Sequence, residues 1–233
     1  MPDATKPCDP HLDVVRFQYG LSHLTRALNA RRKIKIVAIG SSSTAGEGDI
    51  MPFPHRLEFA LRKRFPDRMI DVLNRGIGGQ EAPEELSRFE SDVLAEAPTL
   101  VIWQVGTNAI YHRDLYDPPG VATTIATGVG WLKNIETDII LMDLQYAPIL
   151  LEKQPHDTRL MVSLISSVAR AAEVNLFPRF ALMKRWEDDG IAPDAMFGPD
   201  GLHQTDFSTD CVTRSLDLAI DAAVGTIPTA PAV

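Results

Sequence analysis

The chain has 233 residues, of which 45% are hydrophobic and 23% are charged. These fractions are ordinary for a globular protein, and they exclude a disordered, collagen-like or disulfide-dense chain. With 31 acidic against 23 basic residues the net charge is −8, so we expect no nucleic acid among its partners, because such binding neutralises many phosphates.

Short apolar runs recur along the chain, most of them followed by a glycine or a polar residue. Runs of this length that are rich in β-branched residues and end in turn residues are typical of buried strands. In chain order the predicted strands span residues 34–39, 69–73, 100–105, 139–144 and 174–177, and the last is the weakest pattern.

Amphipathic stretches separate the apolar runs and predict helices. The segment 81–97 carries acidic residues and Pro83 in its first turn, which are signals of a helix start. In chain order the predicted helices span residues 54–65, 81–97, 158–172 and 205–223.

Strands that alternate with helices of these lengths predict a parallel sheet covered on both faces. We therefore expect an α/β fold, a three-layer α/β/α sandwich around a parallel five-stranded sheet. No repeat, low-complexity stretch or linker divides the sequence, which predicts a single domain over residues 1–233 with its core at about 33–223. A leader (1–30) that can form a helix precedes this core, and a Pro/Ala-rich, loose tail (225–233) follows it.

In open sheets of this kind ligands bind beyond the carboxyl ends of the strands, so the loops that follow the strands are the first place to seek chemistry. The first such loop, residues 40–46 (GSSSTAG), holds three serines. A serine on a tight strand-to-helix turn can expose its hydroxyl next to backbone N–H groups at the helix start. A plain turn or a phosphate cradle is the alternative, and the adjacent Ser41, Ser42 and Ser43 leave the register of a nucleophile open.

Glycines and an amide follow the next two predicted strands. Residues 74–80 (NRGIGGQ) allow positive φ and close backbone approach, which suits an N–H aimed at an anion or simply a flexible helix entry. Residues 106–108 (GTN) put Asn108 where its amide can donate to a developing oxyanion or cap the following segment.

An acid and a base lie three residues apart in the late segment 198–203 (GPDGLH). An imidazole such as that of His203 can take a serine proton at neutral pH, and Asp200 is near enough in sequence to orient it. Pro-Asp-Gly is also ordinary turn chemistry, which is the alternative for Asp200. Because a second His or Cys at metal-ligand spacing is missing, we expect no metal and no cofactor.

The serine after the first strand, the glycine turn after the second, Gly-Thr-Asn after the third and Asp-x-x-His near the end together resemble the SGNH (GDSL-type) hydrolases, a family of esterases and lipases. The resemblance covers about residues 33–223, in the right order. It implies a flavodoxin-like SGNH hydrolase fold and a carboxylic ester hydrolase.

The resemblance also implies a role for each matching residue. Ser42 would attack the ester carbonyl, His203 would take and return the proton, and Asp200 would orient His203. The N–H groups of Ser42 and Gly79 and the side chain of Asn108 would form the oxyanion hole.

Two flanking residues depart from the family pattern. The usual Gly-Asp-Ser-Leu reads GSSS at residues 40–43, and the usual Gly-Thr-Asn-Asp reads GTNA at residues 106–109. Both departures remove an acid beside a candidate catalytic group, so they bear on specificity more than on the type of reaction.

The substrate expected for this site is a small acyl ester, such as an O-acetylated carbohydrate. A non-hydrolytic module that binds an acyl-glycan or an anion, and an acyltransferase on the same scaffold, are the alternatives. Beyond the fourth predicted strand, Gln145 and Tyr146 are candidates for binding a polar acyl or sugar group, and Arg75 for attracting an anionic substrate. The alternatives are that Tyr146 packs in the protein and that Arg75 is a solvated surface residue.

The chain shows no signal for a membrane or for export. No apolar run approaches the roughly 20 residues of a transmembrane helix. The N-terminus lacks the charged-then-apolar pattern of a signal peptide, so we expect a cytoplasmic protein unless a leader has been removed. Cys8 and Cys211 are typical of lone thiols in a reducing compartment, and we favour unpaired cysteines over a disulfide.

Overall fold

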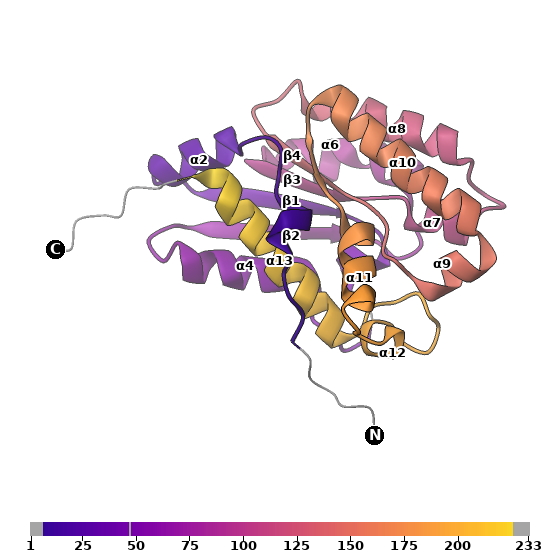
Figure 1. Cartoon of the computed structure of the whole chain (residues 1–233). Coiled ribbons are helices and arrows are strands. Elements are labelled where there is room, and N and C mark those ends of the chain that lie inside the picture. The colour runs from indigo at the N-terminus through magenta and orange to yellow at the C-terminus, as the bar shows by residue number, and fades with distance from the viewer. Residues whose placement is uncertain (1–6, 47, 226–233) are drawn as a thin grey trace.

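A single parallel sheet of five strands forms the middle of the molecule (Figure 1). The structure is a computed structural model that describes residues 7–46 and 48–225. The strand order is β2-β1-β3-β4-β5, which confirms the predicted five-stranded parallel sheet. The strands are β1 (Ile34–Gly40), β2 (Ile70–Gly76), β3 (Leu100–Gln104), β4 (Asp138–Met142) and β5 (Asn175–Phe177).

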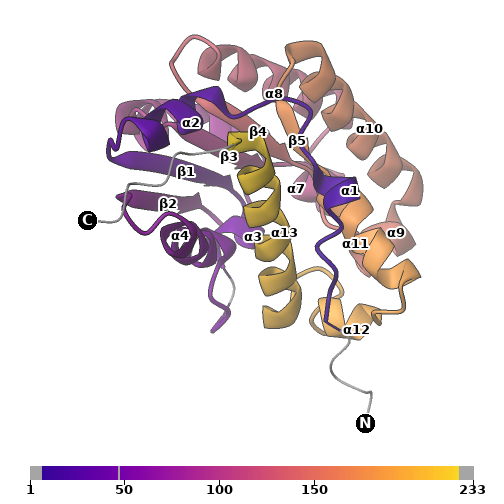
Figure 2. The ribbon, with the colours of Figure 1, turned by 60° about the vertical axis from the view of Figure 1, so that its left-hand side comes forward.

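Helices cover both faces of the sheet and complete the three-layer α/β/α sandwich (Figure 2). In chain order they are α1 (Leu12–Val15), α2 (Ser22–Asn29), α3 (Ser42–Ala45), α4 (Phe53–Arg64), α5 (Ala82–Ser87), α6 (Phe89–Asp92), the 3-10 helix η1 (Leu94–Glu96), α7 (Thr107–Tyr111), α8 (Pro118–Leu132), α9 (Pro148–Lys153), α10 (Pro155–Ala172), α11 (Arg179–Asp188), α12 (Pro193–Met196) and α13 (Asp206–Val224). On one face α13 packs against α4 and α2, and on the other α8 packs against α5 and α10. Over residues 7–46 and 48–225, no helix combines the length and apolar character that a membrane span needs.

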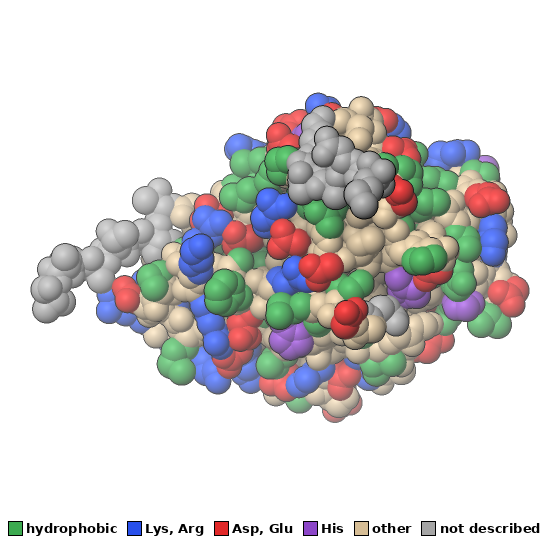
Figure 3. All heavy atoms as spheres, turned by 90° about the horizontal axis from the view of Figure 1, so that it is seen from below, with side chains coloured by type: hydrophobic (Ala, Val, Ile, Leu, Met, Phe, Trp, Pro, Cys, Tyr) green, Lys and Arg blue, Asp and Glu red, His purple; other side chains and the backbone are tan. Residues whose placement is uncertain are grey.

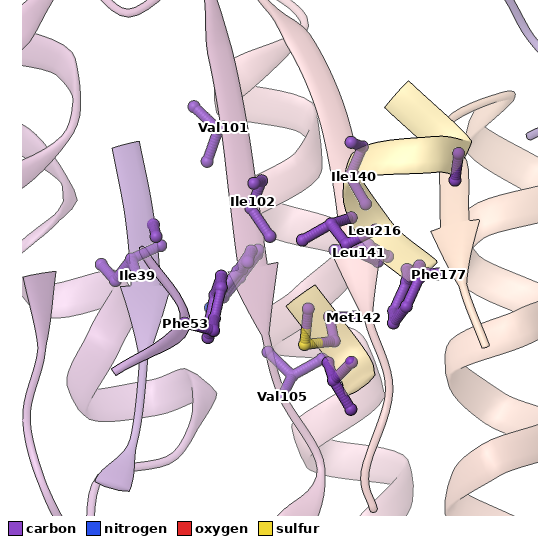
Figure 4. Close-up of a cluster of buried hydrophobic side chains, with 14 of the residues drawn as sticks. Ile39, Phe53, Val101, Ile102, Val105, Ile140, Leu141, Met142, Phe177 and Leu216 are labelled. Atoms are coloured by element: carbon purple, nitrogen blue, oxygen red, sulfur yellow. The ribbon is translucent and has the colours of Figure 1, made fainter. Parts of the chain in front are cut away.

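The core is built by the apolar runs of the strands and by the inner faces of the helices (Figure 4). Ile39, Ile102 and Ile140 on three neighbouring strands are fully buried, and Phe53 from α4 and Leu216 from α13 join them. A sheet covered on both faces buries alternate side chains on each side, which explains why these strands read as continuous apolar runs.

The helix predicted over 81–97 is interrupted, and this prediction is corrected by the structure. The backbone leaves the helical region at Arg88 (φ −111°, ψ 10°), between α5 and α6. Arg88 is held there by side-chain bonds to Gln80 Oε1 (2.7 Å) and to Asp92 Oδ2 (2.7 Å). The break lets Phe89 pack edge-on against the Trp103 ring, 4.7 Å away between centroids. Tertiary contacts therefore override the local helix signals.

Helix α8 was not predicted, because its segment is rich in proline, glycine and threonine, which are weak helix formers. It begins where the Asp117 carboxylate accepts the N–H of Gly120 at 3.0 Å, a regular N-cap. Burial of Val121, Ile125 and Val129 on one side stabilises it.

The leader contains α2, which is tied to the start of β4. The Asp138 carboxylate accepts the N–H groups of His23 (3.3 Å) and Leu24 (2.8 Å) at the first turn of this helix. The loose tail expected at 225–233 lies, apart from residue 225, outside the described residues.

Cys8 and Cys211 form a disulfide, so the prediction of unpaired cysteines is wrong. The bond joins the segment before α1 to α13, with the two Cα atoms 6.0 Å apart although 203 positions separate them in sequence. No local pattern reports such a long-range approach. Because disulfides persist in oxidising compartments, the pairing also removes the support that lone thiols gave to a cytoplasmic location.

Candidate active site

The polar loops singled out in the sequence meet at the carboxyl edge of the sheet. β1 lies between β2 and β3, so the chain leaves β1 toward one neighbour and reaches the other later. Open α/β sheets bind ligands at such a switch point. Figure 3 views the molecule from below, where histidines and charged side chains of both signs share the surface.

Ser42, His203 and Asp200 form one hydrogen-bonded chain. His203 Nε2 lies 3.0 Å from Ser42 Oγ, and His203 Nδ1 lies 2.6 Å from Asp200 Oδ2. Ser42 is at the start of α3, whereas Asp200 and His203 lie in the loop before α13. Ser42 and His203 are separated by 161 positions in the sequence. The fold thus joins two distant segments in the order that nucleophile activation by a base requires.

The three adjacent serines have different surroundings. Ser41 is buried, and its hydroxyl donates to Gln104 Oε1 at 3.0 Å. Ser43 lines a small cavity beside Ser42. Only Ser42, among these three, has its hydroxyl beside His203.

Gln104, at the end of β3, anchors the serine turn and was not identified from the sequence. Its Oε1 accepts the Ser41 N–H (3.0 Å), the Ser41 hydroxyl (3.0 Å) and the Thr44 hydroxyl (3.2 Å). On the other side, Gly76 must be a glycine, because a Cβ there would lie under 3.0 Å from the backbone of Ala45. A polar residue closing an otherwise apolar strand was the available signal for Gln104.

Asp200 both builds a turn and contacts the imidazole. Its Oδ1 accepts the N–H groups of Leu202 (2.9 Å) and His203 (3.0 Å), while Oδ2 lies on His203 Nδ1. Burial alone would raise the pKa of the Asp200 carboxyl, but the hydrogen bonds from Leu202 and His203 hold it below its usual value. The turn interpretation and the acid interpretation of this residue are therefore compatible.

Gly79, in the loop before α5, and Asn108, in the first turn of α7, lie in segments that are tied to each other. Asn108 is buried, and one N–H of its amide donates to the carbonyl of Gln80 at 2.8 Å, directly after Gly79. Gly79 has a φ of 79°, a left-handed value that favours glycine. No heavy atom lies within 4 Å of where a Cβ would stand on it, so this position is open.

Glu81 braces the turn that carries Asn108, and sequence reasoning missed it. Its buried carboxylate accepts the N–H groups of Ala82 (3.1 Å), Gly106 (2.8 Å) and Ala109 (2.9 Å). Burial raises the pKa of Glu81, although these hydrogen bonds oppose the rise. The Glu-x-x-Glu pattern of a capping box was the signal that marked this position.

All three predicted substrate-binding residues are engaged in contacts within the protein. Arg75 pairs with Glu96, with Nη2 2.7 Å from Oε1, so its guanidinium is engaged in an ion pair within the protein. Gln145 is only 1% exposed, so the expected contact with substrate conflicts with its burial. Tyr146 is partly buried and its ring packs edge-on against Phe180, with the centroids 4.9 Å apart.

The free space beside Ser42 is small. A cavity of about 20 Å³ adjoins it, little more than the room a single water needs. Its lining comes from the serine turn, the following loop and the start of α13: Ser42, Ser43, Gly46, Ile50, Pro52, His203, Gln204 and Thr209. A far larger groove of about 1050 Å³ runs along α4 and α13, and neither Ser42 nor His203 lines it.

The match to a known family covers almost the whole chain. The sequence profile of the non-GDSL lipase-like family matches residues 7–226. The chain belongs to the non-GDSL lipase-like family. The family name agrees with the lipases and esterases that the combined motifs resemble, and with the replaced Gly-Asp-Ser-Leu motif at residues 40–43.

Solved structures share the fold of this non-GDSL lipase-like protein. Axe2, an acetylxylan esterase from Geobacillus stearothermophilus, is 19% identical in sequence and has a TM-score of 0.69. The match covers 80% of this chain and 94% of the Axe2 chain. LAE5, an α/β hydrolase from the metagenome of Lake Arreo in Spain, is 20% identical with a TM-score of 0.70, covering 83% and 98%. TesA is 20% identical with a TM-score of 0.66, covering 80% and 97%. At these identities the likeness confirms the predicted fold.

A shorter match links the chain to a curated protein. The uncharacterized lipoprotein YqeF of Bacillus subtilis (strain 168) is 32% identical over 90 residues, which is 38% of this chain. The match spans 37% of the length of that relative.

Asp143 and Arg179 are buried side by side beneath the site. Arg179 Nε donates to the carbonyl of Asp143 at 3.0 Å, and the Asp143 carboxylate accepts the N–H of Phe180 at 2.9 Å. Burial raises the pKa of Asp143 to about 7, and burial lowers the pKa of Arg179 to about 10. Asp143 is therefore protonated in the folded protein over a pH range in which an unfolded chain would ionise it.

Asp143→Asn is expected to remove a pH-dependent loss of stability. Between about pH 4 and pH 7 the folded wild type binds a proton at Asp143 that the unfolded chain releases, so its free energy of unfolding falls as the pH rises. The variant lacks this proton, so its stability relative to wild type should rise by up to about 4 kcal/mol across that window. Urea unfolding at pH 4.5, 6 and 8 measures this, and parallel curves for both proteins would contradict it.

Proposed function

We propose that this protein is a serine ester hydrolase for small acyl esters, with Ser42 as the nucleophile, His203 as the general base and Asp200 as the orienting acid. The observation that carries the proposal is the unbroken chain of hydrogen bonds from Ser42 Oγ through both ring nitrogens of His203 to Asp200. Such a chain keeps one tautomer of the imidazole and directs Nε2 at the hydroxyl.

The first half-reaction forms an acyl-enzyme. Ser42 Oγ attacks the ester carbonyl carbon while His203 Nε2 takes the hydroxyl proton, and the imidazolium is stabilised by the Asp200 carboxylate. Collapse of the tetrahedral intermediate breaks the bond to the alcohol oxygen, which receives the proton from His203. The products of this step are the free alcohol and an ester on Ser42.

The oxyanion of the intermediate needs donors that are already in place. The N–H groups of Ser42 and Gly79 and the second N–H of the Asn108 amide are the donors we assign to it. The bond from Asn108 to the Gln80 carbonyl supports this assignment, because it fixes the amide against the loop that carries Gly79. The Glu81 carboxylate holds the backbone on both sides of Asn108.

The second half-reaction releases the acid. A water molecule takes the place of the alcohol, gives its proton to His203 Nε2 and attacks the acyl carbon. Collapse returns the proton to Ser42 Oγ and frees the carboxylic acid.

An O-acetylated carbohydrate is the substrate class that we propose. The cavity beside Ser42 is small, about 20 Å³, which favours a short acyl group over a long one. An acetylxylan esterase among the structures that share the fold supports a sugar as the alcohol part.

The test is labelling with a fluorophosphonate, followed by mass spectrometry of the intact protein. We expect one adduct on wild type, the same adduct on Ser43→Ala as the matched control, and none on Ser42→Ala. No adduct on wild type, under conditions in which a known serine esterase labels fully, would favour a binding module that lacks an activated serine. Product analysis with an acetylated xylo-oligosaccharide then separates hydrolysis from acetyl transfer to a second sugar.

A further inference from the structure

A buried polar network lies beneath the proposed active site, and Gln145 is its centre. Gln145 Oε1 accepts the Thr107 hydroxyl at 2.8 Å and Arg179 Nη2 at 2.7 Å. Gln145 Nε2 donates to the carbonyl of Leu202 at 3.2 Å. Both Gln145 and Arg179 are 1% exposed, so no substrate reaches this amide directly.

The other two hydrogen-bond partners of the Gln145 side chain, Thr107 and Leu202, each precede a proposed catalytic group in the sequence. Thr107 precedes Asn108, the proposed oxyanion donor, and Leu202 precedes His203, the proposed base. Arg179 also contacts the residue that follows His203, because its Nη1 donates to Gln204 Oε1 at 3.3 Å. The network therefore joins the first turn of α7 to the loop before α13.

Fold stability alone does not explain a buried polar network at this place. Burying a guanidinium and an amide removes both from water, and apolar residues of similar volume often stabilise a fold at least as well. What a hydrogen-bonded hub supplies, and an apolar cluster does not, is a fixed direction and distance between the groups that it joins. The two segments joined here carry Asn108, the proposed oxyanion donor, and His203, the proposed base.

We propose that Gln145, held in place by Arg179, is a positioning residue that fixes Asn108 relative to His203. The inference rests on the proposed function, since that function makes Asn108 the oxyanion donor and His203 the base. In this role Gln145 makes no contact with substrate. Its bonds hold the donor and the base in register, and a misplacement of about 1 Å in such a pair can cost on the order of 10²-fold in rate.

The test compares steady-state kinetics of variants on p-nitrophenyl acetate. Gln145→Met keeps the volume and removes all three bonds, so we expect kcat to fall about 10- to 100-fold with KM changed less than about threefold. Thr107→Val removes only the bond on the Asn108 side and should lower kcat by a smaller factor. Thr107→Ser keeps the hydroxyl, so its kcat should stay within about twofold of the wild-type value. The double variant of Gln145→Met and Thr107→Val should lose no more than Gln145→Met alone, because the bond that Thr107→Val removes is already absent there.

A second buried amide provides the matched control. Asn175 Oδ1 accepts the Tyr19 N–H and Asn175 Nδ2 donates to the Tyr19 carbonyl, at 3.0 Å each, so this amide is engaged with the segment before α2. Asn175→Leu should lower the melting temperature as much as the Gln145 variant does but leave kcat unchanged.

The outcomes separate this inference from the proposed function. If wild type turns over the ester only when Ser42 is present, but Gln145→Met and Thr107→Val both keep kcat within twofold, only the positioning role is wrong. If Gln145→Met does not fold, the pair Thr107→Val and Thr107→Ser decides alone. If wild type shows no turnover that depends on Ser42, both the proposed function and the positioning role are overturned.

Discussion

Replacing Ser42 by alanine is expected to lower kcat on p-nitrophenyl acetate by about 10⁴-fold or more, since it removes the atom that forms the acyl-enzyme. In the tautomer that a general base requires, the Ser42 hydroxyl donates to His203 Nε2, and Ser41 cannot take its place because its hydroxyl donates to Gln104. Any residual rate should come from the oxyanion donors and from binding alone.

The fold is expected to tolerate this change. Ser42 is partly exposed, and alanine removes one oxygen without opening a core cavity. Circular dichroism and the melting temperature should match those of wild type. Ser43→Ala is the control for a change in the same turn and should retain its turnover. Full activity in Ser42→Ala would refute the nucleophile assignment.

Asn108→Ala should lower kcat by about 10²- to 10³-fold with little change in KM, which is the usual cost of one lost oxyanion donor. The effect falls on kcat because the amide is placed to meet charge that develops only in the transition state. Steady-state kinetics on the same ester measure both constants.

The control for Asn108 is an amide with a similar bond far from the proposed site. Asn134 donates its Nδ2 to the carbonyl of Gly130 at 3.0 Å, as Asn108 does to Gln80 at 2.8 Å. Asn134→Ala should leave kcat unchanged. A loss below about threefold in Asn108→Ala would show that the Gln80 bond is the whole role of this residue.

The strands and the places of the candidate groups were predictable because their signals are local. Runs such as residues 34–39 are rich in β-branched residues and apolar at every position except Lys35, which is what a sheet covered on both faces favours. Once the sheet is parallel, the carboxyl ends of its strands share one edge, and Ser42 and Asn108 follow from that geometry.

The supporting residues were not predictable, because their signals are long-range. Gln104 and Glu81 read as ordinary polar residues until the fold shows which backbone N–H groups their side chains accept. Gln145 occupies a loop where a substrate contact is a reasonable expectation, and only its burial and its bonds to Thr107 and Leu202 reveal another environment. The segments of α5, α6 and α8 differ from expectation for the same reason, since tertiary packing overrides weak local preferences.

The disulfide between Cys8 and Cys211 turns almost the whole fold into a covalent ring. The strands of the sheet and all three members of the Ser42–His203–Asp200 chain lie inside it. A protease that cuts any one peptide bond between the two cysteines opens the ring but detaches nothing. The two pieces remain linked through the disulfide. A nicked molecule therefore migrates as one chain on a denaturing gel until a reductant is added.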